Sequence, residues 1–239
     1  MNPTFLLGGE LEVGRLGFGA MRVVGDREEG ARVVRRAVEL GVTLIDTADI
    51  YGAGVSEEVV AEALYPYPEG VVIATKGGMG HGLHERLRDA RPEYLRRACE
   101  ASLRRLRLER IDLYQLHRHD PQVPIEESIG ALETLQREGK IRLIGVSNFS
   151  LGQLRRAQSV ARIVSVQNEY NRGLLTSDDV LDACEAEGIG FMPWSPLGEG
   201  LGDAADELRW LLDRSPVMLP IPGTSSVAHL EENMRAVGA

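Results

Sequence analysis

Cysteine is scarce in this 239-residue chain, which holds only Cys99 and Cys184. The two lie far apart in segments typical of helices, and neither belongs to a CxxC pair or to a spacing that metal ligands use. Two reduced thiols in a cytoplasmic protein is the simplest interpretation. The first residues, MNPTFLLGGELEV, also lack the positive charges and the long apolar stretch of a signal peptide.

Long hydrophobic runs and an excess of positive charge are missing as well. No stretch approaches the roughly 20 apolar residues that a membrane span needs. The net charge of -9 argues against a nucleic-acid partner, because phosphate contacts require a basic surface. With 43% hydrophobic residues and no linker or break in composition, we expect one domain over residues 1–239.

The chain contains a regular alternation of short apolar runs and amphipathic segments. Strands are predicted at 15–19, 43–48, 71–76, 112–117, 141–148, 163–171, 190–196 and 217–223. Helices are predicted at 28–40, 57–65, 91–108, 126–138, 151–160, 178–187, 204–213 and 226–236. Eight strand–helix units in a row predict an α/β fold of the (β/α)₈ TIM-barrel type. An open doubly wound sheet is the alternative, although it usually has fewer strands at this length.

A β-hairpin is expected before the first of these units. The stretch TFLLGGELEV places Gly8 and Gly9 between two apolar-rich runs, which is typical of a tight turn joining two strands.

Polar residues follow the predicted strands where each strand ends. Asp46 and Tyr51 come after the second strand, Lys76 closes the third, and His117 closes the fourth. Because the carboxyl ends of barrel strands meet at one rim, these side chains are expected to lie together. Each alone has an ordinary explanation, as a solvated lysine, a packing tyrosine or a satisfied imidazole. Their coincidence at one rim favours a catalytic site.

These four side chains suit a reaction in which an oxygen atom gains negative charge. A phenol has a pKa near 10, and a neighbouring ammonium lowers that pKa. A carboxylate beside the ammonium holds it charged, so Asp46, Lys76 and Tyr51 form a plausible general acid. His117 could orient a carbonyl oxygen by a hydrogen bond. Reduction of an aldehyde or a ketone by hydride is such a reaction.

Several stretches resemble, in order, the signatures of the aldo-keto reductase family. They are DTADIYG, IATKGG, DLYQLHRHD, IGVSNFS, SVQNEYN, PWSPLGEG and IPGTSSVAHLEEN, and the resemblance covers about residues 15–233. It implies an NAD(P)H-dependent carbonyl reductase acting on a small-molecule carbonyl substrate. It also implies a catalytic tetrad with Tyr51 as the proton donor, made of Asp46, Tyr51, Lys76 and His117.

The same resemblance implies a cofactor site. The nicotinamide carboxamide would be bound by Ser147, Asn148 and Gln167. Trp194 would stack on the nicotinamide ring, although a core tryptophan is the simpler alternative. The pyrophosphate would meet backbone N–H groups of Ser195, Leu197, Gly198 and Gly200. The last helix begins with Thr224, Ser225 and Ser226, and its N-terminus favours an anion. The remaining residues of the expected cofactor site are Gly223, His229, Glu232 and Asn233.

Two positions depart from the family pattern. Gly223 stands where many members have a lysine, and His229 stands where they have an arginine. Both family residues bind the adenosine 2′-phosphate, so NADP(H) is expected with only a weak preference over NAD(H). Several βα loops also look shortened and no tail follows the last helix, which predicts an open pocket with weaker cofactor binding and a broad substrate range or low activity.

Two other functions compete with this interpretation. His117 and His119 form an HxH pair at a strand end, as in metal-dependent barrel hydrolases. Further metal ligands are expected from other strands there, and no histidine falls on strands five to seven. The other alternative is a barrel that keeps a cofactor site but acts as a redox-sensing subunit or an inactive scaffold.

Overall fold

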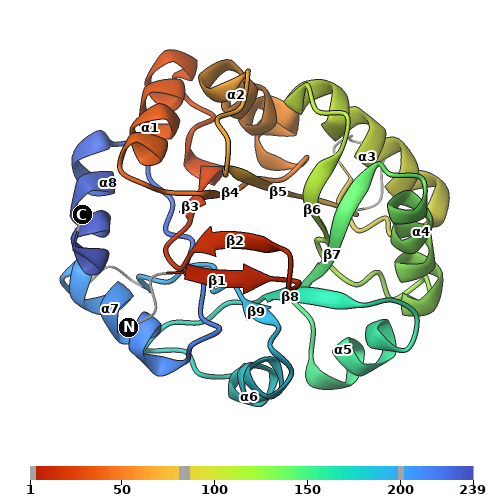
Figure 1. Ribbon diagram of the computed structural model, residues 1–239. Coiled ribbons are helices and arrows are strands. Elements are labelled where there is room, and N and C mark those ends of the chain that lie inside the picture. The colour runs from red at the N-terminus through yellow and green to blue at the C-terminus, as the bar shows by residue number, and fades with distance from the viewer. Residues whose placement is uncertain (1–3, 81–86, 199–201, 239) are drawn as a thin grey trace.

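A computed structural model describes residues 4–80, 87–198 and 202–238, and its centre is a parallel sheet that curls into a barrel (Figure 1). The strands are neighbours in sequence order, β3-β4-β5-β6-β7-β8-β9. Their bounds are β3 Phe18–Gly19, β4 Leu44–Asp46, β5 Val72–Gly77, β6 Ile111–Leu116, β7 Ile141–Ser147, β8 Ile163–Gln167 and β9 Gly190–Phe191. The fold is therefore the expected (β/α)₈ barrel.

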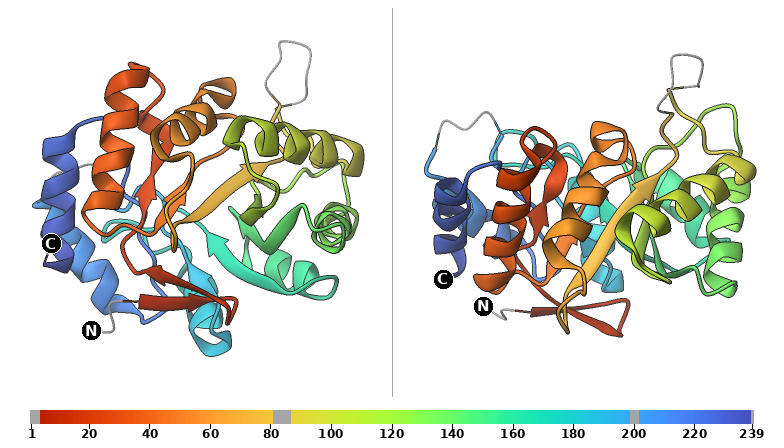
Figure 2. Two further views of the ribbon diagram at one scale, coloured as in Figure 1. Left: turned by 45° about the horizontal axis from the view of Figure 1, so that its top comes forward. Right: turned by 90° about the horizontal axis from the view of Figure 1, so that it is seen from above.

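A ring of helices surrounds the sheet, as Figures 1 and 2 show. Their bounds are α1 Arg27–Glu39, α2 Val55–Leu64, α3 Pro92–Leu106, α4 Ile125–Arg137, α5 Leu151–Gln158, α6 Asp178–Glu187, α7 Ala204–Arg214 and α8 Val227–Met234. Short 3₁₀ helices in the described part of the chain are η1 Ala20–Arg22, η2 Tyr51–Gly54 and η3 Arg235–Val237. Cys99 and Cys184 are buried free thiols on α3 and α6. No helix in the described ranges has the length and apolar character to cross a bilayer.

The predicted eighth strand, residues 217–223, differs from expectation because it forms no regular strand. On one side Leu219 N donates to Phe191 O at 2.8 Å. On the other side the carbonyl oxygens of Pro220 and Pro222 accept from Gly17 N and Gly19 N at 2.9 and 3.1 Å. Proline has no N–H to donate in return, so this ladder keeps only its acceptor bonds. The segment still closes the barrel between β9 and β3.

A hairpin covers the end of the barrel where the strands begin. Its strands β1 (Thr4–Leu7) and β2 (Leu11–Gly14) pair antiparallel around the turn at Gly8 and Gly9, as expected. Gly14 N donates to Thr43 Oγ1 at 2.7 Å, just before β4 begins. The hairpin lies across this end of the barrel in Figure 2. Apolar side chains of the hairpin and of the barrel interior form one buried cluster, which includes Leu7, Leu11, Val13, Leu44, Ala74, Leu113, Leu143, Met192 and Leu219.

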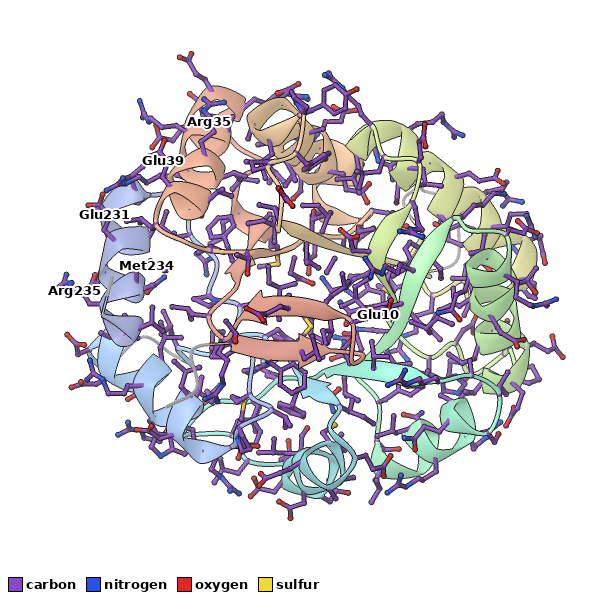
Figure 3. The ribbon with its side chains drawn as sticks, viewed as in Figure 1. Glu10, Arg35, Glu39, Glu231, Met234 and Arg235 are labelled. Atoms are coloured by element: carbon purple, nitrogen blue, oxygen red, sulfur yellow. The ribbon has the colours of Figure 1, made fainter. Side chains whose placement is uncertain are left out.

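The helix ring is completed by contacts between its first and last members. Arg36 of α1 pairs with Glu231 of α8 at 2.8 Å and with Glu39 at 3.2 Å. Figure 3 shows Glu39 and Glu231 on neighbouring edges of the two helices. Beneath them, Val33 and Val34 of α1 belong to the larger core between helices and sheet. The first and last helices, α1 and α8, therefore contact each other and complete the ring of helices.

Close packing at the barrel closure predicts a stability effect at Gly19. A Cβ added there would meet Ile221 O at 2.7 Å, so a side chain forces the backbone apart. We expect Gly19→Ala to lower the free energy of unfolding by about 1–3 kcal/mol in urea. Gly130→Ala is the matched control, because a Cβ within α4 meets nothing within 4 Å and alanine stabilises a helix by up to about 1 kcal/mol. Equal stability of the two variants would contradict the closure described above.

Candidate active site

A fully buried ion pair lies at the rim where the strands end. Lys76 of β5 donates from Nζ to Asp46 Oδ2 and to Thr47 O, both at 2.7 Å, and to Tyr51 Oη at 3.3 Å. An ammonium carries three N–H groups, so each has an acceptor. Burial lowers the pKa of Lys76, but the carboxylate of Asp46 and the phenol of Tyr51 outweigh it and raise that pKa. Lys76 is thus charged and fixed in one position.

The second oxygen of Asp46 is held by two amides from across the barrel. Gln167 Nε2 of β8 donates to Asp46 Oδ1 at 2.9 Å, and Gln115 Nε2 of β6 donates to the same atom at 3.3 Å. Burial raises the pKa of Asp46, while Lys76 and these amides oppose that rise. The carboxylate therefore ties together strands that are distant in the sequence.

Tyr51 enters the site from a tight turn. It begins η2, in which Gly52, Ala53 and Gly54 all have positive φ of 59°, 53° and 95°. The Lys76 ammonium lies 5.0 Å from the centre of the Tyr51 ring. Burial raises the pKa of Tyr51, and the opposing effect of Lys76 is smaller. The expected net lowering of that pKa is therefore wrong for this structure, and Tyr51 is a neutral phenol near pH 7.

His117 packs edge-on against Tyr51, with ring centres 5.9 Å apart. Burial lowers its pKa well below 6.5, and the charges of Lys76 and Arg118 lower it further. Its Nδ1 is buried without a hydrogen-bond partner among the described residues. A neutral imidazole therefore stands beside the phenol.

One cavity of about 350 Å³ opens onto these groups. Eleven of the residues expected at the site line it, namely Asp46, Tyr51, His117, Ser147, Asn148, Gln167, Trp194, Ser195, Leu197, Gly198 and Gly223. Lys76 lies behind Tyr51 and Asp46, which it contacts directly. The lining does not include Thr224, Ser225, His229, Glu232 or Asn233, and Gly200 lies outside the described residues.

Asn148 links three strand ends through its side chain. Its Nδ2 donates to Ser147 Oγ at 2.9 Å and to His117 O at 3.3 Å, and its Oδ1 accepts from Trp194 Nε1 at 3.1 Å. Its backbone has a positive φ of 58°, a conformation that asparagine tolerates better than most residues. Asn148 thus orients the Trp194 indole on the cavity wall.

The turn after Trp194 is supported by a residue that the sequence did not single out. Asn171 Nδ2 donates to Ser195 O at 3.1 Å, while its Oδ1 accepts from Gly173 N at 3.0 Å. Ser195 and Gly198 have positive φ of 53° and 55°, and Gly198 N already donates to Ser195 O at 3.0 Å. The Gly198 N–H that was expected to meet pyrophosphate is therefore used within the turn.

The first turn of α8 uses its hydroxyl groups as caps. Ser226 Oγ accepts from His229 N at 3.5 Å, and Thr224 Oγ1 accepts from Ser226 N at 3.0 Å. Ser225 and His229 are exposed. A Cβ at Gly223 would lie 2.8 Å from Gly19 O, so glycine suits the close approach of the two chain segments.

The structure adds lining and supporting residues beyond the expected set. Gln115 contacts Asp46, and Met21, Arg22 and Arg118 line the cavity. Gln115 had a sequence signal, because in a strand it shares a face with His117 two residues later. No pattern pointed to the arginines.

The metal interpretation of the HxH pair meets no matching cluster. Within the described residues, no group of three or more His, Cys, Asp or Glu side chains could hold a metal ion. His117 instead faces Tyr51, as described above.

The chain matches the aldo/keto reductase family over residues 15–207 and belongs to it, which makes it an oxidoreductase. An uncharacterised oxidoreductase of Schizosaccharomyces pombe is 43% identical, over 96% of this chain and 83% of that protein. Pyridoxine 4-dehydrogenase of Escherichia coli is 40% identical, over 98% of this chain and 92% of the relative.

Solved structures agree with this membership. A glycerol dehydrogenase of Gluconobacter oxydans has a TM-score of 0.92 at 28% identity, and the match covers 100% of this chain and 91% of that one. An aldo/keto reductase of Klebsiella pneumoniae in complex with NADP and acetate has a TM-score of 0.88 at 29% identity, with the same coverage.

The lowered pKa of His117 predicts a pH effect on stability. Between pH 6.5 and its lower folded-state pKa, only the unfolded chain binds a proton at this imidazole, so acidification favours unfolding. We expect His117→Gln to reduce the loss of unfolding free energy between pH 6.5 and 5.5 by about 1 kcal/mol. Urea titrations at both pH values measure it.

His229→Gln, on the exposed side of α8, is the matched control for this experiment. It should leave the loss of stability on acidification as it is in the wild type. If His117→Gln lost as much unfolding free energy between pH 6.5 and 5.5 as the wild type does, a neutral, buried His117 would be contradicted.

Proposed function

We propose that this chain reduces aldehydes or ketones to alcohols with a nicotinamide cofactor, and that Tyr51 donates the proton. The observation that supports it most is the position of the Tyr51 hydroxyl, which lies 3.3 Å from the buried Lys76 ammonium on a residue that lines the cavity. The names of two relatives, pyridoxine 4-dehydrogenase and glycerol dehydrogenase, agree with interconversion of small alcohols and carbonyl compounds.

The role of each residue follows from its charge state. Tyr51 is protonated near pH 7 and can donate its proton to a carbonyl oxygen that gains charge. As the proton leaves, the fixed Lys76 ammonium stabilises the developing phenolate. Asp46 keeps that ammonium charged and oriented. The neutral His117 imidazole can donate one hydrogen bond to the same carbonyl oxygen.

The cavity suits a nicotinamide nucleotide. Trp194 offers a flat ring held by Asn148, and Gln167 leaves its Oε1 as an acceptor because its Nε2 donates to Asp46. The turn from Trp194 to Gly198 and the backbone of Gly19 and Gly223 also line the cavity. Bound there, the cofactor would supply hydride to the carbonyl carbon.

Tyr51→Phe tests the proton donor directly. The variant keeps the ring and its packing but removes the acidic hydroxyl. We expect kcat for an activated aromatic aldehyde with NADPH to fall by about 10²–10⁴-fold. The dissociation constant of NADPH, measured by quenching of tryptophan fluorescence, should change less than about threefold, since such a loss belongs to the chemical step.

Tyr67→Phe is the matched control, because the Tyr67 hydroxyl donates to Leu106 O at 2.7 Å, outside the cavity. Its kcat should stay near the wild-type value. Unchanged turnover in Tyr51→Phe would overturn the mechanism. Wild-type protein that binds NADPH without turning over any aldehyde would favour the cofactor-binding, non-catalytic alternative.

We also propose NADP(H) as the preferred cofactor, by a small margin. The support is the NADP complex of the Klebsiella pneumoniae relative and the hydroxyl groups that begin α8. Gly223 and His229 replace the cationic pair expected there, so hydrogen bonds from hydroxyl groups are left to distinguish the 2′-phosphate. For an exposed hydroxyl we take the lower end of the contribution of a hydrogen bond to a charged group, about 1.5 kcal/mol, which predicts NADPH binding up to about 10-fold tighter than NADH.

Fluorescence titration with both nucleotides measures that ratio. Ser225→Ala removes an exposed hydroxyl next to the capping groups and should bring the ratio toward one. Tighter binding of NADH than of NADPH would make NAD(H) the cofactor.

A further inference from the structure

Arg118 lies in the cavity wall and forms no ion pair with any carboxylate of residues 4–80, 87–198 and 202–238. It follows His117 at the carboxyl end of β6, is partly buried, and lines the cavity. Several exposed arginines of the described chain pair with carboxylates, such as Arg96 with Glu138 at 2.7 Å and Arg156 with Glu126 at 2.8 Å. Arg118 directly follows His117 in the chain and lines the same cavity, and its charge adds to the lowering of the pKa of His117.

Among the described residues, the cavity offers Arg118 no carboxylate that is free to pair with it. Asp46 is the acidic residue in its lining, and both Asp46 oxygens already accept hydrogen bonds from Lys76, Gln115 and Gln167. The protein as a whole carries a net charge of -9, so the positive charge of Arg118 is a feature of the cavity and not of the protein surface in general. A guanidinium fork binds a carboxylate or a phosphate through two parallel hydrogen bonds.

A second cation in the lining, Arg22, follows β3, whereas Arg118 follows β6, three strands further along the sheet. Arg22 ends η1, which begins directly after Gly19, and Gly19 closely approaches Gly223. That is the wall along which we propose the cofactor to lie, whereas Arg118 adjoins the residues proposed to hold the carbonyl oxygen. The two arginines therefore have different expected ligands, Arg22 the cofactor and Arg118 the substrate.

We propose that Arg118 determines substrate specificity, by binding an acidic group at the end of the substrate away from its carbonyl. The preferred substrates are aldehydes or ketones that carry a carboxylate or a phosphate. This inference rests on the proposed function, since it assigns the substrate of the same site. It differs from a broad, unselective substrate range, which the shortened loops alone would predict.

The test compares two aldehydes with saturating NADPH, 4-formylbenzoate and its methyl ester. They share the ring and the aldehyde, and only the first carries a negative charge opposite the aldehyde. We expect Arg118→Gln to lower kcat/KM for 4-formylbenzoate by about 10- to 100-fold, mainly through KM, since a charge-assisted hydrogen bond contributes about 1.5–3 kcal/mol. The value for the ester should fall less than about threefold. Arg118→Lys should keep part of the selectivity, because the charge remains without the fork.

Salt and Arg22→Gln are the controls. Raising the ionic strength should lower kcat/KM for 4-formylbenzoate in the wild type more than in Arg118→Gln, because salt screens the attraction. Arg22→Gln should raise the KM of NADPH and change the acid-to-ester ratio less than Arg118→Gln does. Equal losses on both aldehydes in Arg118→Gln, or equal effects of the two arginine variants on the ratio, would overturn the proposal.

Binding separates this proposal from the catalytic one. Terephthalate has the same ring with a second carboxylate in place of the aldehyde, so it cannot be reduced, and calorimetric titration of NADP-saturated protein reports on Arg118 without turnover. Wild type should bind it at least 10-fold more tightly than Arg118→Gln. If terephthalate binding differs in this way but neither aldehyde is turned over, the result would support the binding of an acidic group by Arg118 and reject the proposed reductase activity. Turnover with equal terephthalate binding would reject Arg118 alone.

Discussion

The buried pair of Lys76 and Asp46 is the interaction on which the site depends. Removing two charges from water is costly, and it is tolerated only when hydrogen bonds satisfy them from every side. Thr47 O and Tyr51 complete the ammonium, and two amides complete the carboxylate. The pair thus holds the Tyr51 hydroxyl in place, and it does so with residues from four different strands or their loops.

The barrel interior explains why such a pair can exist there. Its lower part is apolar and is covered by the hairpin, whereas its upper part holds Asp46, Lys76, Gln115 and Gln167 above that layer. Water is excluded from below, and the cavity opens from above. The low-dielectric surroundings strengthen each electrostatic contact, and they also keep Tyr51 and His117 neutral near pH 7.

Much of this was readable from the sequence because strands and helices alternate with little ambiguity. In the described residues the helices and four of the strands formed close to their predicted ranges, whereas β3, β8 and β9 are shorter than the predicted 15–19, 163–171 and 190–196. The segment at 217–223 failed as a regular strand because Pro220 and Pro222 cannot donate, a local detail that outweighs its apolar pattern. Among the site residues, Asn148 and Gln167 were expected to face a ligand, and both line the cavity. Their amides also bond Trp194 and Asp46, which no spacing along the chain predicts.

The sequence by itself determined the order of the βα units and, through the ends of those strands, which residue types meet at one rim. The tertiary structure alone decided which groups share hydrogen bonds, which of them are charged, and which arginine faces the cavity. The reason is physical. Periodicity and strand ends are local properties of the chain, whereas pKa and pairing depend on burial and on partners far apart in the chain, 121 residues in the case of Gln167 and Asp46.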